Sequence, residues 1–214
     1  MPGNNDFNPS IWRKKPNQHR AVATVDAILV AANELFASQG YYKTTTNHIA
    51  EKAGVGIGSL YDYFPNREAI AMALMEETAA SISNDIRSLF NRHFDEKIET
   101  IVPIVFTTIF NWHKEHQNIL IKLANEAPEL RQTAQMLSIE KLISRTGFIY
   151  MSEHQQEFSV ENLDAAYGFI SLAVIASIKQ YLADPIKQVS EEQFLDNLIR
   201  MGLLFLKAEL RNNS

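Results

Sequence analysis

The chain has 214 residues, of which 46% are hydrophobic and 21% are charged, with a formal net charge of −5 and no cysteine. These values are ordinary for a globular protein of one or two domains with a sizeable core, and the lack of thiols excludes disulfides and thiolate metal sites. The first residues do not have the pattern of a signal peptide, and no apolar run approaches the roughly 18 residues that span a bilayer. We therefore expect a cytoplasmic protein with no membrane partner.

The negative charge is distributed unevenly. Residues 1–67 hold seven Lys and Arg against five Asp and Glu, a net charge of +2, whereas the remainder holds 13 against 20, a net charge of −7. A basic end on an acidic body fits a protein that binds nucleic acid through its N-terminal part.

Residues 1–20 are polar and proline-containing, which indicates a flexible arm. Two interpretations of its basic residues stay open: an arm that reaches DNA phosphates or the minor groove, or a solvated tail. These basic residues are Arg13, Lys14, Lys15 and Arg20. The first helix is expected from about Thr24 to Ser38, and Gly40 ends it.

The stretch Thr45–Phe64, TTNHIAEKAGVGIGSLYDYF, predicts two short helices joined by a tight turn. A threonine hydroxyl caps the first helix. Gly54 stops it in the left-handed conformation, which glycine adopts without steric cost. The second helix is expected from about Gly56 to Phe64, and a unit of this kind places its second helix in the major groove of DNA.

The rest of the chain shows helical patterns alone, so we expect an all-α protein. Asn66 is expected to cap a helix that ends near Ser81. Ser190 and Gln193 have the spacing of a capping box at the start of the last helix. The last two helices are apolar on more than one face, which is typical of a central core helix or of a helix that pairs with another chain. The expected helices after Ser81 are 83–94, 97–116, 118–126, 129–154, 161–183 and 191–210.

The motif and its flanks resemble the DNA-binding signature of the tetracycline-repressor (TetR) family of bacterial regulators. The similarity covers roughly Arg20 to Glu77, with AILVAANELFASQGY before the motif and LYDYFPNREAI at its end. The resemblance implies an N-terminal three-helix helix-turn-helix domain joined to a larger helical domain that binds an effector and dimerises. In this interpretation the arm is 1–20, the DNA-binding domain is 21–81 with its motif at 45–64, and the C-terminal domain is 82–214.

Ten residues of the N-terminal domain are candidates for contact with DNA. By the resemblance, Asn47 reaches a base or a phosphate. Arg67 lies in the first turn of its helix, where a cation opposes the helix dipole, and this makes sense if a DNA phosphate docks there. The ten are Thr45, Thr46, Asn47, Ile57, Gly58, Ser59, Tyr61, Asp62, Tyr63 and Arg67.

Three of these positions leave alternatives open. Helical spacing places Ile57 near the buried face of its helix, whereas the resemblance places it at the groove, beside a thymine methyl group. Asp62 either accepts a hydrogen bond from a cytosine amino group or pairs with a neighbouring Arg or Lys. Two tyrosines either flank the groove with hydroxyls on phosphates or serve as core aromatics only; these are Tyr61 and Tyr63.

The resemblance also implies a small-molecule pocket between the central helices and a four-helix dimer interface built by the last two helices and their copies. The aromatic residues of this part are otherwise core residues. Candidate pocket residues are Phe106, Phe110, Trp112, Phe148, Tyr167 and Phe169. Candidate interface residues are Leu172, Ala176, Leu198, Met201 and Phe205.

Other chemistry has little support. His113 and His116 share one side of a helix without a further clear ligand, so no metal site is expected, and no cofactor is implied. No nucleophile motif or carboxylate pair stands out, so we expect no enzyme.

We expect a homodimeric transcription regulator, a repressor that binds a palindromic DNA operator and is released by a small-molecule effector. The alternative is a protein that binds or sequesters a small molecule and carries a vestigial DNA-binding head.

Overall fold

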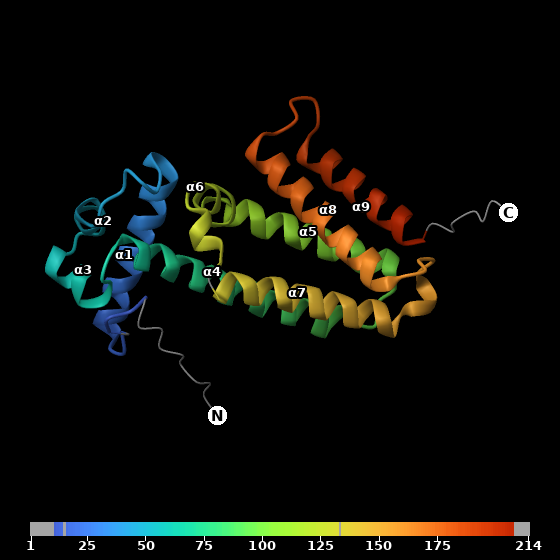
Figure 1. Ribbon diagram of the computed structural model, residues 1–214, viewed down its shortest axis with the longest axis horizontal. Helices are drawn as coiled ribbons and strands as arrows, with labels where there is room; N and C mark the ends of the chain where they lie inside the picture. The colour runs from blue at the N-terminus through green and yellow to red at the C-terminus, as the bar shows by residue number, and fades with distance from the viewer. Residues whose placement is uncertain (1–10, 15, 133, 208–214) are drawn as a thin grey trace. The chain divides into compact units, whose positions relative to one another are not determined.

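The computed structural model describes residues 11–14, 16–132 and 134–207, and for 131–132 and 134–141 it describes the backbone alone. No strand occurs in these residues, so the predicted all-α fold is confirmed. The shorter elements are the π-helix η1 (Asn118–Leu123) and the 3-10 helices η2 (Pro128–Gln132) and η3 (Gln155–Glu157). The α-helices (Figure 1) are α1 (His19–Gln39), α2 (Thr46–Ala53), α3 (Ile57–Tyr63), α4 (Arg67–His93), α5 (Ile98–Glu115), α6 (Ala124–Glu126), α7 (Ala134–Glu153), α8 (Leu163–Ala183) and α9 (Glu191–Lys207).

The chain forms two compact units. The first contains the described residues up to Ala79 together with Asn118–Leu137, and the second contains Ala80–Gln117 and the described residues from Ser138 onward. The segment 118–137 therefore belongs to the unit that carries the helix-turn-helix, although the sequence grouped it with the C-terminal part.

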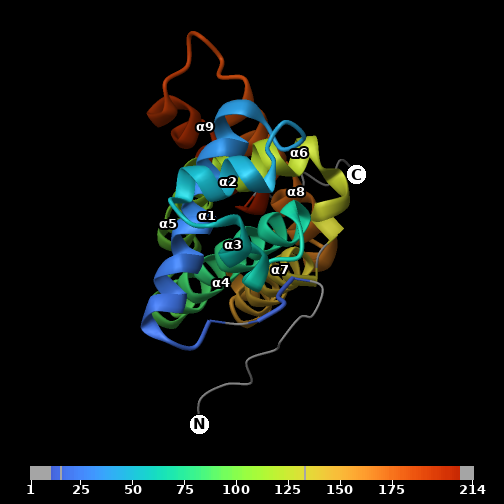
Figure 2. The same ribbon diagram turned by 90° about the vertical axis from the view of Figure 1, so that its left-hand side faces the viewer.

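The first unit is built on α1, α2 and α3, which pack together beside one another (Figure 2). Val25, Ile28, Ala32 and Phe36 recur along one face of α1 and are buried, because their helical spacing gathers them on the side that faces the other helices. The helix begins at His19, five residues before the predicted start, because no proline follows Pro16 to prevent it.

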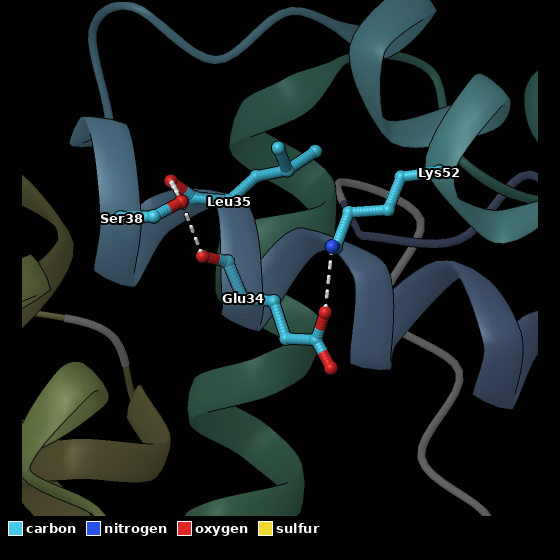
Figure 3. Close-up of polar contacts among 4 residues, drawn as sticks. All are labelled: Glu34, Leu35, Ser38 and Lys52. Carbon is cyan, nitrogen blue, oxygen red and sulfur yellow. Dashed lines mark hydrogen bonds and ion pairs between the residues drawn. The ribbon is translucent and has the colours of Figure 1, made fainter.

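A salt bridge connects the exposed side of α1 with α2. The ammonium group of Lys52 lies 2.8 Å from the carboxylate of Glu34 (Figure 3). In the same view the hydroxyl of Ser38 donates to the carbonyl oxygen of Glu34 at 2.8 Å. Because both members of the ion pair are exposed, the pair contributes little to stability.

Helix α4 is a single helix, so the prediction of two helices with a break near Ser81–Ser83 was wrong. Ile82 and Ile86 are buried and lie four residues apart, so they continue one apolar face through the expected break. No glycine or proline occurs there to end the helix.

The second unit packs α5 against α8 and α9. Pro103 lies inside α5. The predicted capping box at the start of α9 is confirmed, since the N–H of Ser190 donates to the side chain of Gln193 at 3.0 Å and the N–H of Gln193 donates to the hydroxyl of Ser190 at 3.2 Å. Residues 208–210, expected at the end of this helix, lie outside the described residues.

Two helices, α1 and α8, are long and apolar enough to cross a membrane when judged by length and composition alone, although the sequence pattern had suggested that no run was long enough. The core helices of soluble proteins pass the same test. Both helices contribute buried side chains to their own unit, Ile28 and Phe36 from α1 and Val174 and Ile178 from α8.

Candidate nucleic-acid interface and apolar cavity

Helix α2 starts at a threonine cap, as predicted. The side chain of Thr45 accepts a hydrogen bond from the N–H of His48 at 3.2 Å. The next residue, Thr46, shares a hydrogen bond of 2.9 Å with the hydroxyl of Tyr61 on α3. Asn47 is exposed in the first turn. Gly54 ends the helix with φ 68°, in the left-handed conformation, so α2 and α3 are oriented by local chemistry that the sequence already carries.

One face of α3 is buried and the opposite face is open. Leu60 and Phe64 are fully buried in the core of the first unit, whereas residues 57–59, 61 and 62 are exposed on the other side of the helix. Ile57 is 39% exposed, which places it on the open side that the resemblance had favoured. The other exposed residues of this face are Gly58, Ser59, Tyr61 and Asp62.

The two tyrosines of α3 differ in their surroundings. Tyr61 is exposed and its hydroxyl contacts Thr46, so it lies on the open face. Tyr63 is half-buried and packs against the hydrophobic core, so its ring is mostly a core side chain. Asp62 forms no salt bridge with any residue that the structure describes, so the pairing alternative has no partner in that part of the chain.

Arg67 is a structural residue as well as a cation at the start of α4. Its guanidinium donates to the carbonyl oxygens of Tyr42 and Thr44 at 3.1 and 3.0 Å and lies over the ring of Tyr41, 4.1 Å from the centroid. Burial raises the pKa of the Tyr41 hydroxyl, and Arg67 opposes that effect. Arg67 therefore stabilises the turn that leads into α2, a role that the sequence did not indicate.

The starts of α2 and α4 surround an open polar hollow of about 400 Å³ in the first unit. The starts of α2 and α4 both face it, and helix starts present unpaired N–H groups and partial positive charge. Hydroxyl, amide and guanidinium donors at two helix starts are suited to a phosphate group. Its lining includes Thr45, Thr46, Tyr61, Asn66, Arg67 and Glu68.

The second unit contains two neighbouring, partly open apolar cavities of about 90 and about 80 Å³. Three of the predicted pocket residues line them: Phe106 and Tyr167 face both, and Trp112 faces the first. The two cavities share six residues, which form the partition between them. These are Phe90, Val105, Phe106, Gly147, Tyr167 and Ile170.

The other predicted pocket residues lie elsewhere. Phe110 is buried in an aromatic group with Tyr181 and Phe194, and Phe148 is half-buried and does not line either cavity. Phe169 is 60% exposed and contacts the ring of Phe205 on the outside of the unit. An aromatic residue in a helical stripe does not reveal from its sequence whether it lines a cavity, fills the core or faces outward.

The polar groups of the cavity walls have partners within the chain. The hydroxyl of Tyr167 donates to the carbonyl oxygen of Ile143 at 2.8 Å, and burial raises the pKa of Tyr167 to about 12. The hydroxyl of Ser171 donates to Gly168, and the indole N–H of Trp112 donates to Asp85 at 3.1 Å. A ligand would therefore meet carbon surface, which favours an apolar ligand over a polar one.

Among the described residues no group of three His, Asp or Glu side chains is placed to hold a metal ion. His113 is largely buried, and its Nδ1 lies 2.9 Å from the carbonyl oxygen of Ile109. Since a carbonyl can only accept, Nδ1 carries the hydrogen. Burial lowers the pKa of His113, the hydrogen bond with Ile109 opposes this effect, and the charges of Lys179 and His116 lower the pKa further.

Comparison with known proteins gives a family for this geometry. The family model of bacterial regulatory proteins of the tetR family matches residues 28–74, from the middle of α1 to the first turns of α4. Residues 28–74 therefore form a DNA-binding domain of the TetR type. The matched segment includes the capped start of α2, the turn at Gly54 and the open face of α3, and thus all ten predicted DNA-contacting residues of this domain.

Several TetR-family relatives resemble the chain beyond this domain. The fatty acid metabolism regulator protein of Bacillus subtilis is 29% identical over 109 residues, 49% of this chain and 55% of the relative. The structure of the fatty acid degradation regulator FadR of Bacillus halodurans has a TM-score of 0.68 at 21% identity and covers 92% of this chain and 99% of that one. Bacillus subtilis FadR in complex with stearoyl-CoA has a TM-score of 0.66 at 21% identity and covers 86% and 98%.

The structural likeness at this identity establishes the shared fold. The chain spans only about a quarter to just over half the length of the curated relatives that it matches first. These relatives include an A-factor receptor protein of Streptomyces griseus as well as the fatty acid regulator, so the TetR-type domain alone does not specify an effector.

Proposed function

We propose that this protein is a homodimeric TetR-family repressor that binds a palindromic operator in the cytoplasm and is released by an effector with an apolar chain. The observation that carries the proposal is the outward face of α3, held beside the polar hollow by the hydrogen bond between Thr46 and Tyr61. In this proposal residues 21–81 read DNA, and residues 82–214 bind the effector and dimerise, although 118–137 pack with the first unit.

For the DNA complex, we propose that the open face of α3 lies in the major groove while a phosphate occupies the polar hollow. Ile57 would meet a thymine methyl group, and Ser59 and Asp62 would meet base edges. Thr45, Thr46, Tyr61 and Arg67 surround the hollow, so they would bind the phosphate and supply affinity that does not depend on sequence.

The test is selection of bound duplexes from a random DNA pool at moderate salt. We expect one palindromic site, with half-sites separated by about one helical turn. Asp62→Ala should lose the preference at one base pair and keep the others, whereas Tyr61→Phe should weaken all sites alike. Recovery of no preferred sequence, at low salt as well, would leave the alternative function, a small-molecule-binding protein with a vestigial head.

For the effector, we propose a long acyl chain, delivered as an acyl-CoA. Two observations support this class: the cavity walls present carbon surface with their polar groups already bonded, and a structural relative is described in complex with stearoyl-CoA. Each cavity is smaller than the roughly 300 Å³ of a typical small-molecule site. An acyl chain would therefore have to displace the partition formed by Phe106 and Tyr167 and join the two cavities.

Tryptophan fluorescence tests this directly, because the chain has two tryptophans and only Trp112 lines the cavity. In the Trp12→Phe variant, titration with acyl-CoAs of increasing length should change the emission of Trp112, while free CoA should not. The same additions should release the selected operator. Binding of acyl-CoA without any change of operator affinity would support the sequestering alternative. If no acyl-CoA binds, the proposal of an acyl-CoA effector is wrong.

For the dimer, we propose that α8 and α9 pair with their copies across a two-fold axis, the commonest oligomer symmetry. Leu172 is 70% exposed, and Leu204, Met201 and Phe169 are also exposed on these two helices. Ala176 is exposed and Phe205 half-buried, whereas Leu198 is buried within its own chain and is not available to a partner. An exposed apolar patch of this kind marks an interaction surface.

A further inference from the structure

The residues before α1 are anchored in the first unit. Ile11 is fully buried and Trp12 is 9% exposed, and both belong to the hydrophobic core of that unit. The ring of Trp12 lies 4.7 Å from the ring of Phe64, centroid to centroid, and its indole N–H donates to a carboxylate oxygen of Glu76 at 3.4 Å. The prediction of a flexible arm therefore fails for these two residues. Lys15 and residues 1–10 of the arm lie outside the described residues.

The anchored segment is bonded to the end of α3. The backbone N–H of Arg13 donates to the carbonyl oxygen of Tyr63 at 2.8 Å, and its guanidinium donates to the carbonyl oxygen of Tyr61 at 3.3 Å. The last carbonyls of a helix have no partner within the helix, so Arg13 supplies partners that α3 lacks. Figure 2 shows the blue stretch ahead of α1 passing alongside α3.

This anchoring leaves cations at one end of the proposed DNA-reading helix. Arg13 and Lys14 are exposed, as is Arg20 in the first turn of α1. The backbone N–H of Arg13 is bonded to the carbonyl oxygen of Tyr63, the last residue of α3, so Arg13 and Lys14 lie at the C-terminal end of that helix. A charge held in place by its backbone loses less conformational freedom on binding than one on a free tail.

We propose that Arg13, Lys14 and Arg20 form a second DNA contact, in which they bind the phosphates that flank the half-site read by α3. The contact adds affinity for the duplex backbone and carries no base preference, because the groups are long cationic side chains that precede α1 or lie in its first turn and are not part of α3. The inference rests on the proposed DNA-binding function. It differs from the phosphate hollow, which lies at the starts of α2 and α4.

Lys14 provides the cleanest test, because it forms no ion pair with another described residue, whereas Arg13 also bonds α3. The variants are Lys14→Ala and the pair Arg13→Ala/Lys14→Ala. The matched control, Arg87→Ala/Lys187→Ala, removes the same charge from exposed residues of the second unit. Circular dichroism would verify that each variant is folded.

The measurement is the salt dependence of the affinity for the selected operator, by fluorescence anisotropy. Each lost phosphate contact lowers the log–log salt slope by about 1. We therefore expect a reduction of about 1 for Lys14→Ala and of about 2 for the pair, an unchanged base preference in a repeated selection, and a wild-type slope for the control. Wild-type slopes in both variants would overturn the proposal.

Failure of the proposed function is distinguishable from failure of this inference. If the wild-type protein selects no sequence, the same series is measured on a generic duplex at low salt, because a phosphate contact needs no particular bases. A reduced slope there would support the contact while sequence-specific regulation fails. Wild-type slopes on the generic duplex, or no binding to any duplex, would overturn the contact too.

Discussion

The carboxylate of Glu126, at the end of α6, accepts a hydrogen bond from the backbone N–H of Tyr41 at 2.5 Å. This bond lies in the turn between α1 and α2, at a residue 85 positions earlier in the chain. The same carboxylate stands 3.0 Å from where a Cβ on Gly40 would lie, and Gly40 has φ 88°. The turn thus favours glycine for its conformation, and a side chain there would have to shift the carboxylate of Glu126 by a few tenths of an ångström.

Glu126→Ala should destabilise the first unit, because it leaves the N–H of Tyr41 without its acceptor. Glu126 is exposed, so water replaces part of the bond and the expected loss is about 1 kcal/mol. Urea unfolding measures it. The matched control is Glu129→Ala, whose carboxylate makes only a 3.4 Å contact with the hydroxyl of Tyr42; its expected effect is within about 0.5 kcal/mol. Equal losses in the two variants would contradict the role of Glu126.

Arg67→Lys separates the structural role of this residue from its charge. Lysine keeps the charge but lacks the planar group that lies over the ring of Tyr41 and reaches two carbonyl oxygens. We expect a loss of stability of about 1 kcal/mol and weaker binding to every duplex, since the turn into α2 loosens. Unfolding and anisotropy measurements on the same samples check both. A variant as stable and as tightly bound as the wild type would mean that charge alone matters at this position.

Gly147→Ala should disturb the partition between the two cavities. A Cβ at this position would lie 2.5 Å from the ring of Tyr167, and overpacking of this kind costs about 1–3 kcal/mol. Gly168→Ala is the control, because nothing lies within 4 Å of its added Cβ, and alanine is better than glycine in a helix by about 0.5–1 kcal/mol. Thermal unfolding and acyl-CoA binding are measured for both variants, and we expect only Gly147→Ala to lose stability and to alter binding. If the two variants behave alike, Tyr167 is free to move and does not hold the partition.

Leu172→Glu should separate the proposed dimer. The side chain is 70% exposed, so the monomer should remain folded while a charge replaces apolar surface at the interface. Light scattering should give the mass of one chain, and operator affinity should fall because the two half-sites are no longer bound together. Val30→Glu, at an apolar residue of α1 that is 60% exposed, is the control. A Leu172→Glu protein that stays dimeric would move the interface away from this face.

The stability of the second unit should fall as the solution becomes more acidic, because of His113. Its pKa is lowered in the folded chain, mainly by burial, from a usual value of 6.5. Below that value the unfolded chain binds a proton that the folded chain resists, so stability declines as pH falls from about 6.5 toward the lower folded pKa, and it is flat above. His113→Gln should reduce this decline in urea unfolding between about pH 5 and about pH 8. An unchanged profile, matching that of the exposed control His19→Gln, would mean that other groups cause the pH dependence.

Local signals in the sequence predicted where the helices of the DNA-binding domain begin and end. The caps at Thr45 and Asn66 and the left-handed Gly54 are all observed, because each acts on backbone groups within a few residues. The open face of α3 was predictable in the same way, since helical periodicity separates Leu60 and Phe64 from the residues around Ser59. The exposure of Ile57 could not be predicted from periodicity, because this residue lies at the edge between the two faces.

The roles of other residues depend on partners far away in the chain, and periodicity carries no information about them. Arg67 bonds carbonyl oxygens more than 20 positions earlier, and Trp12 packs on Phe64, so Arg67 has a structural role beside its predicted one and Trp12 belongs to the core and not to a flexible arm. Phe106 lines a cavity while Phe169 faces outward, although both lie in apolar helices. Short-range capping and periodicity therefore set the helices and their faces, whereas the packing of distant segments selects which apolar or charged side chains are core, cavity or surface.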